Sequence, residues 1–222
     1  MDRTGPDADE SRATGIRGIR SKWRLRRAVI RQGIAFLAAV VMLGAALYTA
    51  TGVWPPMVAV KSPSMEPHLS RGDLVVVVDP GRFPADGAVQ DTGVVTHRRG
   101  SATRHRSLGA PGDVIVFRPN GVTGTPVIHR AAFWVNESEN WYAKADPASV
   151  DGQDCRSVPQ CPAPHAGFVT KGDANRRYDQ VNGISAPVRP RWTVGKATVR
   201  VPVLGYVRLI ANDLGTSLNY HV

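Results

Sequence analysis

Cysteine is scarce in this sequence, which contains two, Cys155 and Cys161, in 222 residues. They stand in a proline-rich stretch, and His165 is the only histidine close by. A structural zinc site needs four such ligands, so the pair alone predicts no metal centre. A disulfide that closes a small loop is the preferred interpretation if the region lies outside the cytoplasm. Free thiols and a metal site are the alternatives.

Charged side chains are missing between Gln32 and Val60, and acidic ones are missing between Arg17 and Arg31. The second stretch holds seven of the basic residues that give the chain its formal charge of +10. A basic block beside an uncharged run is typical of a membrane protein. The sequence also lacks a helix-turn-helix or aromatic-lined sheet pattern, so nucleic acid is not expected as a partner. We expect other basic residues to contact anionic lipid headgroups, among them Arg98, Arg99, Arg104 and Arg106.

A long apolar run extends from Gly33 to Val53. A helix of about 21 residues rises roughly 30 Å, which is the thickness of the hydrocarbon core of a bilayer. Trp54 then supplies an interfacial aromatic, and the following Pro55-Pro56 pair ends the helix. We therefore predict a transmembrane anchor over residues 33–54. A cleavable signal sequence is the alternative, but it usually has a shorter apolar core nearer the N-terminus.

Basic residues that flank a span stay on its cytoplasmic side. Residues 17–32 are therefore predicted to form a basic cytoplasmic flank, and residues 55–222 a domain outside the cytoplasm. Residues 1–16 are polar and include four acidic side chains, which is typical of a disordered tail. The predicted location is the cell membrane, with one span and a cytoplasmic N-terminus. The C-terminal stretch 203–222 has an apolar run too short to span again, so a last strand or an interfacial segment is expected there.

The region after the anchor contains short runs rich in β-branched residues, punctuated by glycine and proline. No segment of it has a sustained helical period. We therefore predict a mainly β fold, one domain of coiled antiparallel sheets, with polar insertions near residues 79–111 and 136–166. The predicted strands cover residues 57–60, 74–78, 93–97, 113–117, 126–135, 167–170 and 192–203.

Two serines, Ser62 and Ser64, flank Pro63 just beyond the anchor. A serine becomes a nucleophile only if a base removes its proton and donors stabilise the oxyanion. Ser64 in a turn can offer its backbone N–H for this purpose, and Ser62 can place a hydroxyl on the same side of an extended chain. A polar turn that precedes a strand is the alternative interpretation.

The base is sought among six histidines. His129 stands within an apolar strand-like run, where its neighbours can fix the ring. His105 and His165 are expected to be solvated in polar loops, His97 to end a strand, and His68 to lie in a turn. A histidine base predicts that activity falls at acidic pH as the imidazole becomes protonated.

A third polar segment carries two carboxylates, Asp173 and Asp179, in a loop after a predicted strand. Either can accept a hydrogen bond from the imidazole and fix its tautomer. We favour Asp173, because Gly172 before it permits a tight turn. The alternative is that Asp173 forms an Asx turn and Asp179 forms a surface ion pair.

Taken together, these segments resemble the type I signal peptidases, in particular their archaeal and endoplasmic-reticulum branch. The likeness covers roughly residues 30 to 210 and is carried by short motifs that follow an N-terminal anchor: Ser62-Pro63-Ser64-Met65-Glu66-Pro67 with Gly72-Asp73, residues 112–117, Ile128-His129-Arg130, Thr170-Lys171-Gly172-Asp173-Ala174-Asn175, and Asp179. Pro63 is a departure, because the family usually has glycine there; proline stiffens the approach to Ser64 and removes a backbone donor.

The resemblance implies a signal-peptidase-like β-rich domain that cleaves signal peptides from exported preproteins after small residues at positions −1 and −3. It implies Ser64 as the nucleophile, with His129 where the bacterial branch has a lysine, and Asp173 and Asp179 as the two acidic positions. Ser62 and Ser64 would form the oxyanion hole. Preproteins would be the partners, near the protein-export machinery, and no cofactor or metal is expected.

Three alternative hypotheses about the function of this sequence remain open. A lysine could be the base, with Lys171 the first candidate and Lys61 and Lys144 behind it. The enzyme could instead mature one dedicated secreted protein. The chain could also be an inactive, membrane-anchored binding domain, although Ser64, His129 and the two aspartates would then have no reason to occur together.

Overall fold

The computed structural model describes residues 7–206, and it describes side chains at residue 27 and from residue 29 onward. The chain divides into two compact units, Met1–Leu47 and Tyr48–Val222. The expected last strand or interfacial segment over 203–222 falls mostly outside the described residues.

The first unit contains most of helix α1, Asp7–Thr51. Its segment Val29–Thr51 has a mean hydropathy of 2.1 and is long and apolar enough to cross a membrane, and the most apolar 18 residues of this segment are not buried within the chain. The predicted anchor over 33–54 is thus matched by a helix, but one that ends three residues earlier. The expected disordered tail is wrong from residue 7 onward, since α1 already includes Asp7–Thr14.

Helix α1 ends at Thr51 because the next residue, Gly52, adopts the left-handed conformation with φ of 74°. The Gly52 N–H donates to the Tyr48 carbonyl over 2.7 Å, which satisfies one of the last helical acceptors. Glycine is the usual residue at such a helix end because it has no Cβ to clash. Trp54 and the two prolines therefore follow the helix and do not end it.

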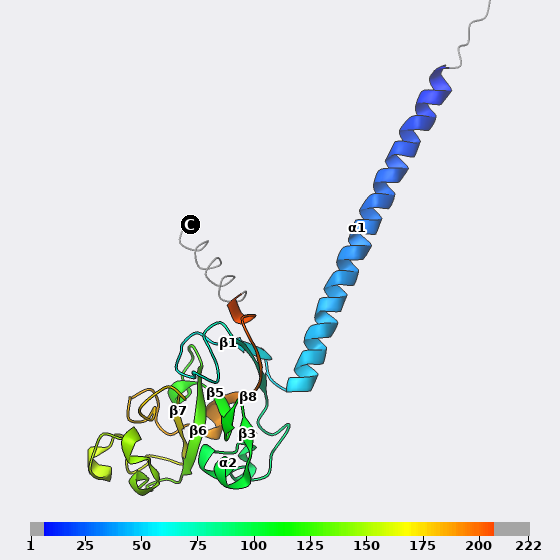
Figure 1. The fold of residues 1–222 in the computed structure, drawn as a ribbon. Coiled ribbons are helices and arrows are strands. Elements are labelled where there is room, and N and C mark those ends of the chain that lie inside the picture. The colour runs from blue at the N-terminus through cyan, green and yellow to red at the C-terminus, as the bar shows by residue number, and fades with distance from the viewer. Residues whose placement is uncertain (1–6, 207–222) are drawn as a thin grey trace, which may run out of the picture. The chain divides into compact units, whose positions relative to one another are not determined.

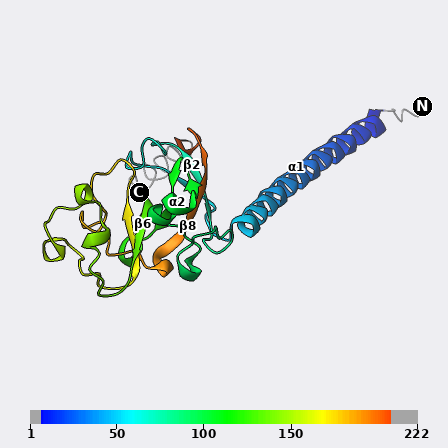
Figure 2. The same cartoon turned by 60° about the horizontal axis from the view of Figure 1, so that its bottom comes forward.

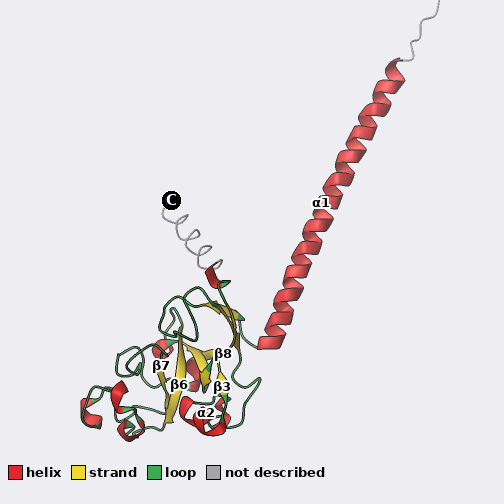
Figure 3. Ribbon diagram, viewed as in Figure 1, coloured by secondary structure: helices red, strands yellow, loops and turns green. Residues whose placement is uncertain are grey.

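The second unit is built on a six-stranded antiparallel sheet in the order β1-β2-β8-β5-β6-β7, shown in Figure 1 and, coloured by secondary structure, in Figure 3. Its strands are β1 (Met57–Ala59), β2 (Leu74–Val78), β5 (Val114–Phe117), β6 (Val127–Val135), β7 (Gly167–Lys171) and β8 (Thr193–Val201). Two further strands, β3 (Arg106–Ser107) and β4 (Ala110–Pro111), form a separate small sheet. The mainly β, antiparallel fold class is confirmed.

Strand β5 shows why this sequence forms a central strand. Its four side chains are all buried, and they alternate between two hydrophobic clusters. Val114 and Val116 join the cluster around Met65 and Leu69, whereas Ile115 and Phe117 join the cluster on the opposite side. Continuous β-branched or aromatic residues of this kind suit a strand that is covered on both faces.

The predicted insertion 79–111 supplies no strand to the large sheet, but it packs against it. It contains helix α2 (His97–Thr103), the 3₁₀ turn Gln90–Thr92, β3 and β4. The predicted strand at 93–97 is wrong. Val95 donates to an Asp113 carboxylate oxygen over 2.8 Å and accepts from the Asp113 N–H over 2.7 Å, so a single residue satisfies backbone groups that a neighbouring strand would otherwise pair.

The predicted insertion 136–166 is a lobe of loops and 3₁₀ turns with its own core, which includes Trp141 and Val158. Its 3₁₀ turns are Tyr142–Lys144, Pro147–Ser149 and Cys155–Ser157; two more, Pro119–Gly121 and Pro190–Trp192, lie elsewhere in the domain. Figures 1 and 2 both place the lobe beside the β6–β7 edge of the sheet. Cys155 and Cys161 form a disulfide within it, so the free-thiol and metal alternatives are wrong.

Candidate functional site

Ser64 is held in a series of tight turns between β1 and β2. The Glu66 N–H donates to the Pro63 carbonyl over 3.0 Å, and the Leu69 N–H donates to the Met65 carbonyl over 2.9 Å. Met65 and Leu69 are fully buried, and burying each such side chain stabilises the fold by about 1.5–3 kcal/mol. These two anchors fix the turn on the core while Ser64 stays partly accessible.

His129 lies on β6, in the part of the strand that pairs with β5 but not with β7. Residues 127–130 pair with β5, whereas pairing with β7 begins only at Arg130. The His129 side chain is buried, with a relative exposure of 6%. A rigid sheet strand thus holds the ring, as the apolar sequence around it predicts.

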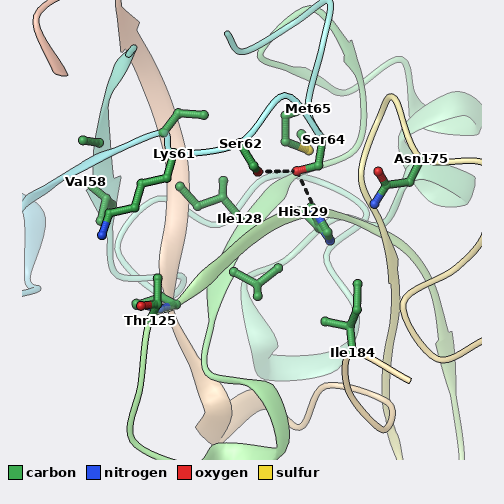
Figure 4. A pocket seen from close by; sticks show the side chains of 14 residues that line it. Val58, Lys61, Ser62, Ser64, Met65, Thr125, Ile128, His129, Asn175 and Ile184 are labelled. Carbon is green, nitrogen blue, oxygen red and sulfur yellow. Dashed lines mark hydrogen bonds between the residues drawn. The ribbon is translucent and has the colours of Figure 1, made fainter. Parts of the chain in front are cut away.

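Ser64, His129 and Asp179 form a continuous hydrogen-bonded chain. The Ser64 Oγ lies 3.0 Å from His129 Nε2, and His129 Nδ1 lies 2.7 Å from Asp179 Oδ2 (Figure 4 for the first contact). Because a carboxylate accepts from Nδ1–H, the neutral ring keeps its Nε2 lone pair for the serine hydroxyl. This is the arrangement that lets an imidazole remove a serine proton.

Asp179 is itself fixed from a second direction. The Thr170 hydroxyl donates to the same oxygen, Oδ2, over 2.7 Å, and the Asp179 N–H donates to the Thr170 carbonyl over 2.9 Å. Both residues have no measurable exposure. Asp179 Oδ1 has no hydrogen-bond partner among the described residues. The buried carboxylate therefore directs its bonded oxygen, Oδ2, at His129.

Asp173 does not contact His129, so our preference for it as the orienting carboxylate is wrong. It accepts two hydrogen bonds from Arg130, from Nε over 2.9 Å and from Nη2 over 2.7 Å, and its Oδ2 lies 2.8 Å from His68 Nδ1. Consecutive strand residues point to opposite faces, so His129 and Arg130 diverge. One loop thus provides a carboxylate to each of them.

The same loop also touches the turn that carries Ser64. The Ala174 N–H donates to the Ser64 carbonyl over 2.9 Å. A Cβ added at Gly172 would lie 2.5 Å from the Ser64 carbonyl oxygen, closer than side chains are found. Gly172 is thus required for the close approach of two backbones, and not for the sharp turn that we expected.

The Ser62 hydroxyl lies beside the Ser64 hydroxyl, as the sequence predicts. Its Oγ is 3.0 Å from Ser64 Oγ. If Ser64 donates to His129, Ser62 must donate to Ser64. The Ser64 N–H has no acceptor among the described residues, so it remains available. A role of Ser62 and Ser64 in an oxyanion hole stays a prediction.

Two of the three lysines that are alternative candidates for the base, Lys171 and Lys144, make other contacts. The Lys171 Nζ donates to the Asn175 carbonyl over 2.8 Å, and Lys144 pairs with Glu139. Lys61 extends away from the Ser64–His129 pair (Figure 4). No hydrogen bond joins any of them to Ser64 among the described residues, whereas His129 Nε2 lies 3.0 Å from the Ser64 Oγ.

Three of the other histidines differ from expectation. His105 is not solvated but lies 2.8 Å from the buried Asp113 carboxylate. His97 begins helix α2 and does not end a strand. His165 is partly buried, with its ring edge against Trp192. His68 does lie in the turn region, and it also reaches Asp173. None of these four is bonded to Ser64 among the described residues.

A pocket of about 590 Å³ opens beside Ser64 and His129, and Figure 4 shows the side chains around it. One wall is residues 58–62 with Ser64 and Met65, the other is residues 125–129, and Asn175 and Ile184 complete it. Among the described residues, β1 pairs with β2 alone, and residues 127–129 have no partner in β7. The pocket therefore lies between two segments whose sheet partners are on one side only.

Burial shifts the titration of the residue next to Asp179. Tyr178 packs in the lobe core against Phe133 and Trp141, and this burial raises the pKa of its phenol. Its hydroxyl accepts a hydrogen bond from the Asp146 N–H over 3.1 Å. Tyr178 thus ties the lobe to the segment that carries the orienting carboxylate.

Several site residues were not identified from the sequence. Thr170 and Arg130 belong to the motifs named above, but the sequence assigns neither of them a role, and it gives no signal for Ile184. Thr170 was foreseeable, because a strand hydroxyl ahead of two carboxylates is a natural donor. The pairing of His68 with Asp173 joins residues 105 apart in the chain and has no local signal.

Among the described residues, no group of three or more His, Cys, Asp or Glu side chains is placed to hold a metal ion. Comparisons with protein-family models and with curated proteins find no match for this chain. The geometry around Ser64 is therefore the main guide to its chemistry.

Proposed function

We propose that this chain is a membrane-anchored serine endopeptidase that removes signal peptides from exported preproteins, cutting after small residues. The observation that carries the proposal is the chain of contacts from Ser64 through His129 to Asp179, at 3.0 and 2.7 Å. A lone serine–histidine contact is common, but a buried carboxylate on the far ring nitrogen gives it the arrangement of a catalytic triad. The apolar segment Val29–Thr51 and the motif resemblance support the choice of substrate.

In the proposed reaction, His129 Nε2 takes the Ser64 proton as Oγ attacks the scissile carbonyl carbon. The Ser64 N–H and the Ser62 hydroxyl stabilise the oxyanion. Collapse of the tetrahedral intermediate breaks the C–N bond, and His129 returns the proton to the leaving amine. Water, deprotonated by His129, then releases the acyl group and restores Ser64. Asp179 stabilises the imidazolium in both steps without taking its proton.

The substrate would bind as an extended strand in the pocket. Among the described residues, β1 and residues 127–129 have sheet partners on one side only, so a peptide between these two segments can pair through its backbone. In an extended peptide, side chains two residues apart lie on the same face of the strand. A preference for small residues at positions −1 and −3 fits this alternation.

The test is cleavage of several unrelated preproteins by the purified full-length protein in a non-ionic detergent, with cut sites read by mass spectrometry. We expect a single cut behind each signal sequence and none with Ser64→Ala. Cleavage of one preprotein alone would favour a dedicated maturation peptidase. No cleavage of any preprotein would contradict the proposal and favour an inactive binding domain.

A further inference from the structure

Lys61 is a cation on the wall of the pocket that the reaction scheme does not use. It stands three positions before Ser64, lines the pocket and is exposed. Figure 4 shows its side chain extended along the wall beside Val58, away from the Ser64–His129 pair. It has no hydrogen-bond or ion-pair partner among the described residues. Its ammonium group is therefore available to a bound molecule.

None of the described residues that line this pocket has an acidic side chain. Apart from the His129 ring, Lys61 is the only ionisable group among its lining residues, and the rest of the wall is mainly apolar. Asp173, the carboxylate in the loop beside Ser64, is already occupied by Arg130 and His68. Glu66 is exposed nearby in the chain but is not part of the lining. A positive charge is thus left uncompensated where substrate would lie.

Lys61 lies on one of the two segments between which an extended peptide would pair. Side chains of such a peptide alternate between the two faces of the strand that it forms, so only those on the face where the Lys61 side chain lies can meet its ammonium group. The long, flexible lysine stem lets its ammonium follow a carboxylate without a fixed geometry. Its effect should therefore depend on the charge and position of a peptide residue and not on its exact shape.

We propose that Lys61 makes the enzyme prefer substrates with an aspartate or glutamate close to the scissile bond, and disfavour lysine or arginine at the same position. This proposal rests on the proposed function, because it assigns a substrate preference to the same pocket. An exposed ion pair is worth about 0.2–1 kcal/mol, so a preference for glutamate over glutamine of about 1.4- to fivefold is expected.

The experiment compares matched peptides that carry glutamate, glutamine or lysine at each position around the cut. The full-length protein in non-ionic detergent is assayed for kcat/KM, and ratios between peptides are taken within each variant. At one position or more, the wild type should rank glutamate over glutamine over lysine. Lys61→Met should flatten the ranking and Lys61→Glu should reverse it. Arg156→Glu makes the same change in net charge in the disulfide loop and should leave the ranking intact.

The same peptides are also tested for binding to Ser64→Ala by fluorescence anisotropy, with and without the Lys61 substitutions. Binding reports the charge preference even if the wild type cuts none of them, a result that would count against the proposed function alone. Raising salt to about 0.5 M should weaken the preference by screening. A ranking that is unchanged by Lys61→Glu, or peptides that bind no variant, would overturn the assignment.

Discussion

At the scale of single residues, two aspartates six positions apart contact different side chains, so substituting each one should have a different effect. Asp179 holds His129, whereas Asp173 neutralises the buried Arg130. Asp179→Asn should lower kcat by about 10³–10⁴-fold with little change in fold, because the amide no longer fixes the productive tautomer. Asp173→Ala should mainly lower stability, by about 3 kcal/mol, because it leaves a buried guanidinium without its partner. Steady-state kinetics and urea unfolding of both variants test this pair. Equal effects on kcat with no difference in stability would contradict the assignment.

Thr170 is expected to position Asp179 through its hydroxyl. Thr170→Val keeps the shape of the side chain but removes the donor to Oδ2, so kcat should fall by about tenfold while KM stays near its original value. Thr170→Ser restores the hydroxyl and should restore most of kcat. A serine variant as impaired as the valine variant would show that packing, and not the hydrogen bond, accounts for the loss.

Residue identities were partly predictable from the sequence. Ser64 and His129 could be found because each stands in a distinctive local pattern, a turn after an anchor and a strand. The two aspartates could not be assigned, because both follow β7 in one loop. Their partners depend on which faces His129 and Arg130 occupy, and that follows from the strand register of β6.

At the scale of elements, the disulfide lobe should be a locally stabilised unit. A hydrogen bond from the Ser138 N–H to the Ala163 carbonyl joins its two ends. The Cys155–Cys161 disulfide links two residues six positions apart within it. Replacing both cysteines with serine should destabilise the lobe by about 2 kcal/mol. Hydrogen exchange should then accelerate in residues 138–163 and remain slow in β5 and β6. Equal acceleration throughout the sheet would show that the lobe does not open separately.

The strands were largely predictable because β-branched runs bounded by glycine and proline have a strong local signal. The conformation of segment 93–97 was not predictable in this way. Val94 and Val95 are buried without a strand partner, and Asp113 makes the hydrogen bonds to Val95 that a neighbouring strand would otherwise make. Helix α2 has seven residues and buries only Gly100, so it lacks the periodic apolar face by which helices are recognised.

At the scale of the whole molecule, the basic flank predicts the orientation of the chain in the membrane. Both native cysteines form a disulfide, so an introduced cysteine supplies the only free thiol among the described residues. Gly124→Cys, in an open surface loop, should react with a membrane-impermeant maleimide in intact cells. Ser11→Cys should react only after permeabilisation. The reverse pattern would contradict the predicted topology.

The central claim is that Ser64 and His129 act as one unit, and the most direct measurement is kcat for preprotein cleavage by Ser64→Ala, His129→Ala and the double variant. Groups that act together lose nearly all their contribution when either is removed. The account predicts that each single variant is as inactive as the double variant, whose circular dichroism spectrum matches the wild type. Substantial cleavage by His129→Ala, or a double variant much slower than both single variants, would contradict it.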